Sequence, residues 1–430
     1  MNAPLTRRRF LQQTSLLTAG AGLLSSQATL RSGPARGDRV LVGIIGCNNR
    51  GMDHIAGYLA VPDAEIAYVC DVDQRVAEKG VAAVASKQER KPTAITDLRR
   101  MLEDPRLDAV SIATPDHWHA PAAILACAAG KHVYVEKPGS HNLHESGLLV
   151  AAARKHKRVI QMGNQRRSWP WVIEAMHALH AGELGTVYFA RGWYTNHRAS
   201  IGRGHATTPP GGLDWTLWQG PAPEQPFRSN IAPYNWHWFW DWGTGELGNN
   251  GVHALDLARW GLGVEYPRRV TCGGGRYHFQ DDWQTPDTMI ATFDFGHKAI
   301  AWEGQSCDPH GFESASFGVS FFGENGSLVL AGNNCKIYDQ HDQVVREIKG
   351  KSDDLLHFVN FIDGIREGKA LNSEVEEGQK ATLLCHLGNI AWRTRHTIEF
   401  DPEKKKIVRN KAANALSTRD YRKGWEPRVA

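Results

Sequence analysis

Long apolar runs, a surplus of one charge and paired cysteines are all scarce in this sequence of 430 residues. After the first 35 residues, no segment approaches the roughly 18 to 20 apolar residues that a membrane-spanning helix needs, so we expect no stable membrane span. Lysine plus arginine (50) nearly balance aspartate plus glutamate (46), and the basic residues are scattered apart from the first ten positions. This distribution excludes nucleic acid as a partner and favours a small polar substrate.

The seven cysteines also exclude two common kinds of cross-link. They are odd in number and contain no Cys-x-x-Cys spacing, which indicates neither a disulfide framework nor a zinc knuckle. We expect most of them to be small buried apolar groups. The histidines and carboxylates show no ligand spacing either, so we predict no metal site.

Apolar residues make up an ordinary 41% of the chain, and its length is sufficient for two domains with separate cores. Tryptophan is abundant, with 15 residues, and several cluster within 193–242 beside glycines and histidines. This mixture is typical of carbohydrate-sized pockets. The alternative is that the rings form the aromatic core of a large sheet domain.

The amino terminus resembles an export signal. Thr6-Arg7-Arg8-Arg9-Phe10-Leu11-Gln12 is similar to the twin-arginine motif, and a weakly apolar stretch and small residues follow up to Ala28. A chance basic start is the alternative. We predict that residues 1–35 are a signal for the twin-arginine translocase and that the mature protein is periplasmic or otherwise exported. Because this pathway carries folded proteins, often with a cofactor in place, structural disulfides are not expected.

From residue 39 to about 165, short apolar runs alternate with amphipathic stretches. Continuous apolar runs are typical of parallel strands buried on both faces, and the alternation indicates βαβ repetition. We therefore predict an α/β, doubly wound Rossmann domain over 36–165. The predicted strands are 40–45, 64–70, 107–113, 132–135 and 159–162.

The pattern changes after about residue 165. Two helices are predicted at 171–181 and 252–260, and short strands joined by glycine-containing turns indicate a largely antiparallel sheet. We predict a C-terminal α+β domain over 166–430 that binds substrate and supports a homo-oligomer. Two further helices, near 355–362 and 378–392, are expected to cover one face or return to the first domain. The predicted strands are 186–194, 288–295, 299–305, 315–322, 327–330 and 336–338.

A glycine-containing turn follows the first predicted strand. In Gly46-Cys47-Asn48-Asn49-Arg50-Gly51 the first glycine permits a tight turn, and the last lets a helix approach the strand and direct its N–H groups at a pyrophosphate. Asn48 replaces the usual middle glycine, and its side chain crowds the phosphates. We predict that Gly46, Asn48, Asn49, Arg50 and Gly51 bind a nicotinamide dinucleotide.

Asp71 ends the second predicted strand, twenty positions after Gly51. A carboxylate there accepts hydrogen bonds from the adenosine ribose and repels a 2′-phosphate, which favours NAD over NADP. NADP remains an alternative, because Arg50 could flank a phosphate.

Three further motifs lie at the ends of predicted parallel strands: residues 113–119 (Ala-Thr-Pro-Asp-His-Trp-His), 136–138 (Glu-Lys-Pro) and 163–165 (Gly-Asn-Gln). With them the chain, from about residue 39 to its end, resembles the Gfo/Idh/MocA family of oxidoreductases. The resemblance implies a Rossmann domain, a large, mostly antiparallel open sheet, a nicotinamide cofactor and a carbohydrate or polyol substrate. It also implies that Lys137 touches substrate near the nicotinamide. The residues that it places at the cofactor are Thr114, Pro115, His119, Glu136, Lys137 and Asn164.

His253 is the predicted general base, because the ordinary pKa of a histidine side chain lies close to working pH. The family often carries an aspartate four residues ahead of this histidine, where both share a helix face, but here that residue is Asn249. An amide can hydrogen-bond a sugar hydroxyl yet cannot accept a proton. Further substrate contacts are predicted for Arg166, Tyr194, His237 and Asp241, together with Asn249 and His253.

These residues predict hydride transfer between a sugar, glycoside or cyclic polyol and a retained NAD, because free NAD(H) is not available to an exported enzyme. Lys137 would stabilise the developing alkoxide while His253 takes the proton. Redox-neutral glycoside cleavage through transient oxidation is a second hypothesis, since some relatives are NAD-using glycosidases. A non-catalytic sugar-binding protein is the third, supported only by Asn48 and Asn249.

Overall fold

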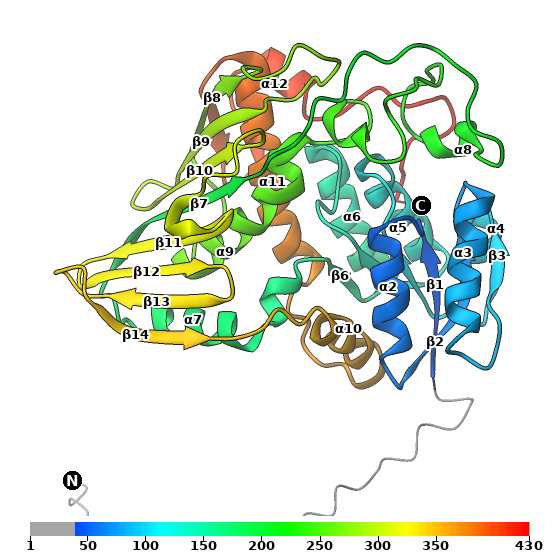
Figure 1. Cartoon of the computed structure of the whole chain (residues 1–430), viewed down its shortest axis with the longest axis horizontal. Helices are drawn as coiled ribbons and strands as arrows, with labels where there is room; N and C mark the ends of the chain where they lie inside the picture. The colour runs from blue at the N-terminus through cyan, green and yellow to red at the C-terminus, as the bar shows by residue number, and fades with distance from the viewer. Residues whose placement is uncertain (1–38, 430) are drawn as a thin grey trace, which may run out of the picture.

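The computed structural model describes residues 39–429, so the predicted export signal lies outside the described residues. The chain forms two lobes built on two separate sheets, with several C-terminal helices packed between and against them (Figure 1). The predicted fold class, a Rossmann domain followed by an α+β domain with a mostly antiparallel sheet, is confirmed.

The first lobe contains a six-stranded parallel sheet in the order β3-β2-β1-β4-β5-β6. This order reverses direction between β1 and β4, and in such sheets the ligand crevice opens at that point, beyond the carboxyl ends of the strands. The strands are β1 (Val40–Ile45), β2 (Ala64–Cys70), β3 (Thr93–Ile95), β4 (Ala109–Ile112), β5 (His132–Val135) and β6 (Ile160–Met162). The connecting helices are α2 (Arg50–Leu59), α3 (Gln74–Ala85), α4 (Leu98–Leu102), α5 (Asp116–Ala128) and α6 (Leu143–His156).

The second lobe contains a ten-stranded sheet in the order β14-β13-β12-β11-β7-β10-β9-β8-β15-β16, in which only the β7–β10 pair is parallel. Side chains alternate between its faces, and α7, α9 and α11 cover one of them. Its strands are β7 (Val187–Thr195), β8 (Arg269–Gly275), β9 (Thr288–Asp294), β10 (Ala299–Gln305), β11 (Phe317–Gly323), β12 (Gly326–Ala331), β13 (Asn334–Tyr338), β14 (Val344–Lys349), β15 (Ile398–Asp401) and β16 (Lys406–Ile407). The helices of this half are α7 (Pro170–His180), α8 (Trp215–Gln219), α9 (Val252–Leu262), α10 (Leu355–Glu367), α11 (Val375–Thr394) and α12 (Lys411–Ala415).

The C-terminal helices return to the first lobe, as one sequence alternative proposed. Phe358 and Phe361 of α10 join the core formed by β1 and β2, and Gly57 of α2 leaves room for the Phe358 ring, which a Cβ would meet at 2.6 Å. Near the end of the chain, Arg419 Nε donates to the fully buried Glu145 of α6 over 2.9 Å. The C-terminal part of the chain is therefore attached to the Rossmann lobe by side chains distant in sequence.

A long segment, residues 196–246, connects β7 to the helical region that contains α9, and we call it the cover segment. Its backbone binds the turn after β2: the Asp214 amide donates to the Val72 carbonyl over 2.9 Å, and the Gln74 amide donates to the Gly212 carbonyl over 2.9 Å. Figure 1 shows this segment passing over the carboxyl ends of the Rossmann strands. Most of its tryptophans form a core of their own, of which Trp218, Phe239 and Trp242 are members.

All seven cysteines are unpaired, and five of them are buried, in agreement with the expected apolar role. Within residues 39–429, no helix combines the length and the apolar character required to cross a bilayer.

Candidate active site and cofactor cleft

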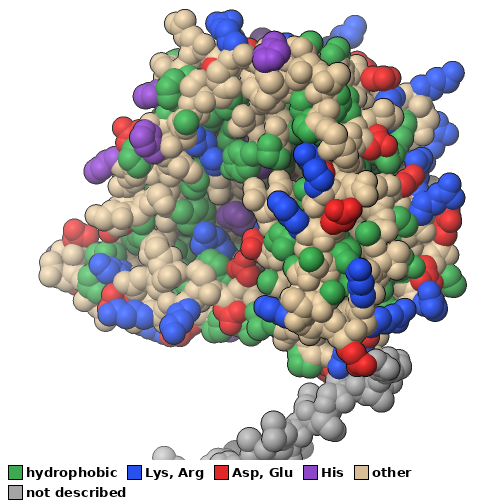
Figure 2. Space-filling view, turned by 45° about the vertical axis from the view of Figure 1, so that its right-hand side comes forward, with side chains coloured by type: hydrophobic (Ala, Val, Ile, Leu, Met, Phe, Trp, Pro, Cys, Tyr) green, Lys and Arg blue, Asp and Glu red, His purple; other side chains and the backbone are tan. Residues whose placement is uncertain are grey.

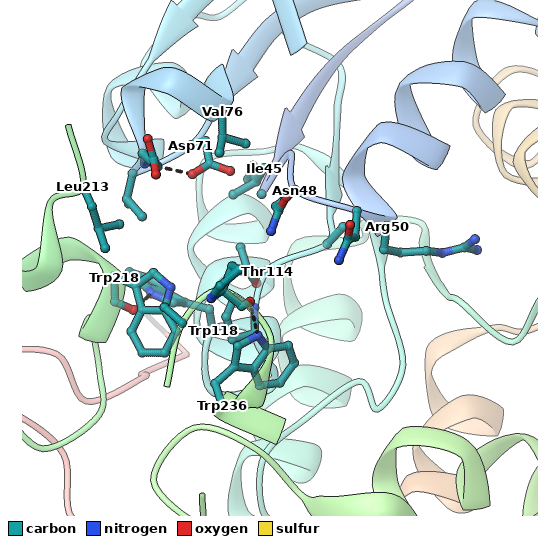
Figure 3. Close-up of a pocket in the computed structure, with 18 of the residues that line it drawn as sticks. Ile45, Asn48, Arg50, Asp71, Val76, Thr114, Trp118, Leu213, Trp218 and Trp236 are labelled. Atoms are coloured by element: carbon teal, nitrogen blue, oxygen red, sulfur yellow. Dashed lines mark hydrogen bonds between the residues drawn. The ribbon is translucent and has the colours of Figure 1, made fainter. Parts of the chain in front are cut away.

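A cavity of about 680 Å³ opens at the carboxyl ends of β1, β2, β4 and β5, the position that the strand order predicts. The cover segment closes its other side with apolar residues, so the cavity lies between the Rossmann edge and this segment (Figure 3). Among its lining residues are the predicted cofactor positions Gly46, Asn48, Asn49, Arg50, Asp71, Thr114, Pro115, His119, Glu136 and Lys137. From the cover segment the lining includes Leu213, Leu217, Trp218, Phe227 and Trp236.

The turn between β1 and α2 has the geometry that its glycines predict. Gly46 has a φ of +79°, and a Cβ there would lie 2.8 Å from the Ala113 carbonyl oxygen. A Cβ on Gly51 would lie only 1.9 Å from the Gly46 carbonyl oxygen, so the helix reaches the strand only with glycine at this position. Asn49 adopts a φ of 42°, which asparagine tolerates better than most residues. The exposed Asn48 side chain lies in the cavity.

Asp71 is fixed at the end of β2 by two backbone donors. The Cys47 amide donates to Oδ2 over 2.7 Å, and the Asp73 amide donates to Oδ1 over 2.9 Å. Burial raises the pKa of Asp71 to about 6 even though both hydrogen bonds favour the charged form. The carboxyl group therefore joins the first turn to the second strand and lines the cavity, where it can accept hydrogen bonds from the adenosine ribose of a bound dinucleotide.

The preference for NAD over NADP is expected to depend on Asp71 and on pH. Above pH 6 the carboxylate repels a 2′-phosphate by about 1–3 kcal/mol, and below pH 6 the neutral acid no longer does so. Dissociation constants for NAD and NADP, measured by calorimetry on emptied protein at pH 5.5 and 8, should show a stronger preference at the higher pH. Asp71→Ser should reduce the preference at pH 8, and an unchanged preference in this variant would contradict the assignment. Because the phosphate itself titrates near pH 6 in both proteins, the comparison between them isolates Asp71.

Glu136 is the centre of a buried polar network beneath the glycine turn. Its Oε1 accepts hydrogen bonds from Arg50 Nε (2.8 Å), His54 Nε2 (3.1 Å) and Gln165 Nε2 (2.8 Å). Burial opposes the charge of Glu136, but Arg50 and His54 lower its pKa well below the usual range. The network orients Lys137 only through its backbone amide, which donates to Oε2 over 3.1 Å.

The bonds to Glu136 define the roles of Arg50, His54 and Gln165. Arg50 is committed to Glu136 and also pairs with Asp354 at 3.2 Å, so it is not a free cation for a 2′-phosphate. His54 has no signal in the sequence, because only the folded chain brings α2 to Glu136, whereas Gln165 belongs to the Gly-Asn-Gln motif that follows the sixth strand.

Lys137 follows β5 and lies at the cavity wall, where its ammonium donates to two oxygens of one residue. Nζ lies 2.8 Å from the backbone oxygen of Asn249 and 3.0 Å from its Oδ1. Burial lowers the pKa of Lys137, while Glu136 and Asp116 act in the opposite direction. The Asn249 amide in turn donates to Glu246 Oε1 over 3.4 Å, which fixes its orientation.

The element that carries Asn249 differs from the prediction. Asn249 lies in a π-helical turn, η3 (Leu247–Gly251), and His253 lies in the first turn of the α-helix that follows. The two residues are thus not on one regular α-helix face, as their four-residue spacing indicated. Single π-helical turns are rare and occur frequently at functional sites.

His253 is half-buried, and within residues 39–429 neither ring nitrogen has a hydrogen-bond partner. Burial, followed by the charges of Lys137 and Arg166, lowers its pKa well below 6.5. The expectation of a pKa close to working pH was therefore wrong, because the sequence reveals neither that the fold buries the ring nor that it places cations near it. His253 is neutral at pH 7, and a ring nitrogen can accept a proton.

A buried ion pair between Arg198 and Glu246, which the sequence did not indicate, lies beside Asn249. Arg198 Nε donates to Glu246 Oε2 over 2.7 Å, and its guanidinium lies 4.7 Å from the centroid of the Trp238 ring. Arg198 also donates to the Tyr234 hydroxyl over 3.1 Å. Lys137, Asn249, Glu246 and Arg198 thus form one continuous chain of contacts.

The predicted substrate contacts separate into two groups. His237 lines the cavity, stacks on Trp236 with ring centroids 3.6 Å apart, and has its pKa lowered to about 3 by burial. Tyr194 lies near the Arg198–Glu246 pair, and its hydroxyl accepts from Asn196 over 2.6 Å. Asp241 is directed elsewhere: its carboxylate accepts from Gln225.

Asp256, three residues after His253 on α9, is bound away from the histidine ring. It forms a two-point ion pair with Arg167, with distances of 2.7 Å and 2.8 Å, and both side chains are buried. This pair joins α9 to the turn after β6 and leaves His253 unassisted.

Unsatisfied polar atoms in the cleft test whether a dinucleotide fits. Thr114 lines the cavity, and its buried hydroxyl has no hydrogen-bond partner among residues 39–429. Both polar atoms of the Asn164 side chain, after β6, are likewise buried without a partner in this part of the chain. His119, by contrast, contacts the Thr114 and Pro138 carbonyls at 2.8 Å and 2.7 Å and so joins two motifs. Buried polar groups rarely remain unpaired, and the riboses and carboxamide of a dinucleotide supply suitable partners.

The fold and this cleft define a two-domain oxidoreductase with a dinucleotide-binding Rossmann domain. Comparison with known protein families identifies it further. Residues 40–164 match the family described as "Oxidoreductase family, NAD-binding Rossmann fold", and residues 192–427 match "Oxidoreductase family, C-terminal alpha/beta domain". The chain belongs to the Gfo/Idh/MocA family, as the motifs predicted, and NAD is the cofactor of its first domain.

Curated relatives of two kinds match the chain. A glycosyl hydrolase family 109 protein of Saccharopolyspora erythraea is 30% identical over 211 residues, which cover 44% of this chain and 46% of the relative. Levoglucosan dehydrogenase of Pseudarthrobacter phenanthrenivorans is 31% identical over 227 residues, covering 52% of this chain and 51% of the relative. The chain thus spans about half the length of the curated relatives that it matches.

Solved structures share the fold. Levoglucosan dehydrogenase in complex with NADH has a TM-score of 0.66 at 19% identity, covering 84% of this chain and 99% of that one. The WlbA dehydrogenase of Bordetella pertussis, in complex with NADH and UDP-GlcNAcA, has a TM-score of 0.65 at 18% identity, with coverage of 84% and 99%.

Proposed function

We propose that this protein transfers a hydride between a hydroxyl-bearing carbon of a sugar, glycoside or cyclic polyol and a tightly held NAD. The observation that carries the proposal is the position of Lys137, whose ammonium lies at the cavity wall in contact with Asn249. The charge of this ammonium acts on His253, whose ring nitrogens are unpartnered within residues 39–429. An ammonium and a neutral imidazole are the two groups that oxidation of a hydroxyl requires.

Each residue has a definite task in this proposal. Lys137 donates to the substrate oxygen and stabilises negative charge as it develops there. His253 accepts the hydroxyl proton, and its lowered pKa keeps it unprotonated at pH 7. Asn249 holds the ammonium, while Thr114 and Asn164 supply unpaired polar atoms to the cofactor side. The bound dinucleotide supplies the hydride acceptor.

Redox-neutral glycoside cleavage is the second candidate, and the matches to glycosyl hydrolase family 109 proteins favour it. A panel of free sugars and p-nitrophenyl glycosides distinguishes the two. Absorbance at 340 nm that accumulates with a free sugar supports net oxidation. Release of p-nitrophenol without accumulated reduced cofactor would replace the first proposal with the second, and neither signal across the panel would contradict both.

We also propose that the cofactor stays bound through purification, because the cover segment closes the cavity with Leu213, Leu217 and Trp218. Mass spectrometry of the denatured protein should detect near-stoichiometric NAD. Changing Leu213 and Leu217 together to serine should release it faster, whereas Leu356→Ser, at an exposed leucine on α10, should not. Protein that purifies empty and binds NAD only at millimolar concentration would contradict retention.

The export proposal rests on the sequence motif around Arg7 and Arg8. Changing both residues to lysine should leave the precursor in the cytoplasm, as measured by fractionation and immunoblotting, because the translocase recognises the arginine pair. Unchanged export would refute the twin-arginine assignment.

We further propose a homo-oligomer formed through the C-terminal domain, where Ile290 is 55% exposed on the sheet. Light scattering of the purified protein tests it.

A further inference from the structure

Arg166 is a cation without a partner beside the proposed catalytic group. It lies in the turn η1 (Gln165–Ser168) after β6, which is adjacent to β5, the strand that Lys137 follows. Its guanidinium carbon lies 3.9 Å from the centroid of the Phe317 ring and 4.7 Å from that of Trp169. Within residues 39–429, the guanidinium of Arg166 forms neither a hydrogen bond nor an ion pair, although the backbone oxygen of Arg166 accepts from the Trp169 amide over 3.2 Å. The neighbouring Arg167, by contrast, is fully paired with Asp256.

A continuous set of contacts connects Arg166 to the substrate side of the site. Phe317, under the guanidinium, pairs with Tyr194 in the β11–β7 ladder. The Tyr194 ring lies 5.9 Å from the guanidinium of Arg198, which pairs with Glu246. The positive charge of Arg166 also contributes to the lowered pKa of His253. Figure 2 shows a hollow between the two lobes with basic and histidine side chains on its walls.

The carboxylates near this site already have partners. Glu136 forms an ion pair with Arg50, and Glu246 with Arg198. Asp116 is buried, accepts a hydrogen bond from the Thr244 hydroxyl and acts on the charge of Lys137. Asp354, whose charge acts on Arg166, pairs with Arg50 at 3.2 Å.

Among residues 39–429, the Lys137 ammonium has hydrogen bonds only to the neutral Asn249, and the Arg166 guanidinium contacts aromatic rings. Burial lowers the pKa of Arg166 to about 10, so it is charged at pH 7. A largely desolvated charge is costly without an opposite charge, and Arg166 has no ion-pair partner in this part of the chain.

We propose that Arg166 binds an anionic group, a carboxylate or a phosphate, on the sugar substrate, so that the preferred substrate is a sugar acid or a sugar phosphate. Stacking between two rings holds the guanidinium plane and leaves its N–H edge free for two parallel hydrogen bonds to either group. This inference depends on the proposed function in one respect, which is that the reacting carbon of the substrate lies at Lys137.

The test is calorimetry of the NAD-loaded protein with matched sugars. The probes are glucose, galactose and mannose, each with its uronic acid and its 6-phosphate. We expect at least one anionic form to bind 30-fold or more tightly than its neutral sugar, and the uronate and phosphate arms identify which group is recognised. Arg166→Gln should abolish this preference, and Arg166→Lys should restore part of it.

Arg191→Gln is the matched control. Arg191 also lies over a phenylalanine ring, 4.5 Å from the centroid of Phe312, and also has no ion pair among the described residues. Arg191 lies on the face of β7 that is turned away from α9. The next residue, Gly192, faces α9, where a Cβ would meet Ala254 at 2.7 Å, and side chains alternate along a strand. The control should keep the anionic preference.

The outcomes separate this inference from the proposed function. If no anionic sugar binds more tightly than its neutral counterpart, or if the preference survives Arg166→Gln, the inference is overturned. In that case reduction of the bound cofactor by a neutral sugar would still support the proposed function. Arg166-dependent binding of an acid that never reduces the cofactor would support the subsite and contradict hydride transfer.

Discussion

Replacing Lys137 by alanine should lower kcat by roughly two or more orders of magnitude while leaving the bound dinucleotide in place. Among the described residues, the ammonium donates only to the two oxygens of Asn249, so it is available to an oxygen that gains negative charge during the reaction. An interaction made chiefly in the transition state lowers kcat when it is removed, whereas one made equally in the ground state raises KM. Single-turnover reduction of bound NAD, followed at 340 nm, measures the step directly.

Lys131 provides the matched control, since it precedes the amino end of the same strand and Lys137 follows its carboxyl end. Its ammonium donates to the Asp104 carbonyl over 2.7 Å, away from the cleft. Lys131→Ala should lower the melting temperature but keep kcat. Equal turnover in Lys137→Ala and the native protein would place the catalytic group elsewhere, and His237 at the cavity wall would be the next candidate.

Asn249→Asp extends the same argument to pH. A carboxylate 3.0 Å from Lys137 Nζ would favour the charged ammonium and raise its lowered pKa, by about one unit or more. Activity that requires the ammonium falls as Lys137 deprotonates, so the alkaline limb of the profile should move to higher pH. The new carboxylate would also lose the amide donor to Glu246 and repel it, which should reduce stability.

Local patterns in the sequence were sufficient for most of the Rossmann sheet. Predicted strands 40–45, 64–70 and 132–135 coincide with β1, β2 and β5, because parallel strands buried on both faces are continuous apolar runs. The strands missed in the second lobe lack such a signal. The β8 strand (Arg269–Gly275) ends in three glycines and is supported by its neighbours β9 and β15.

The site shows the same division between local and tertiary information. The glycine turn, Asp71 and Lys137 were each expected just after a predicted parallel strand, and all three reach the cavity that opens at the carboxyl ends of these strands. The ion pair of Arg198 with Glu246 was not, because the two residues are 48 positions apart and meet only when the cover segment folds over β7. Most tryptophans of this segment proved to be core, while Trp218 and Trp236 also line the cavity.

Replacing His253 by alanine should lower kcat by about 10²- to 10⁴-fold, the usual contribution of a general base. The ring lies beside two cations and has no hydrogen-bond partner within residues 39–429, so its lone pair is free to accept the substrate proton. Its pKa lies well below 6.5, and the native enzyme should therefore keep its activity as pH falls from 8 to 6.5. A loss of activity on the acid side with a midpoint at or above pH 6.5 would contradict the lowered pKa of His253.

The variant should respond to pH in a different way. Without the imidazole, hydroxide takes the proton, so the remaining rate should rise with pH across the range where the native rate is flat. His253→Gln tests whether the ring merely fills space, since an amide of similar size cannot accept a proton in this range. If His253→Gln retained native kcat with NAD still bound, the histidine would be structural. Equal losses of kcat in both variants, with residual rates that increase with hydroxide concentration, would show that His253 accepts the proton of the substrate hydroxyl, whose oxygen Lys137 stabilises as it becomes negative.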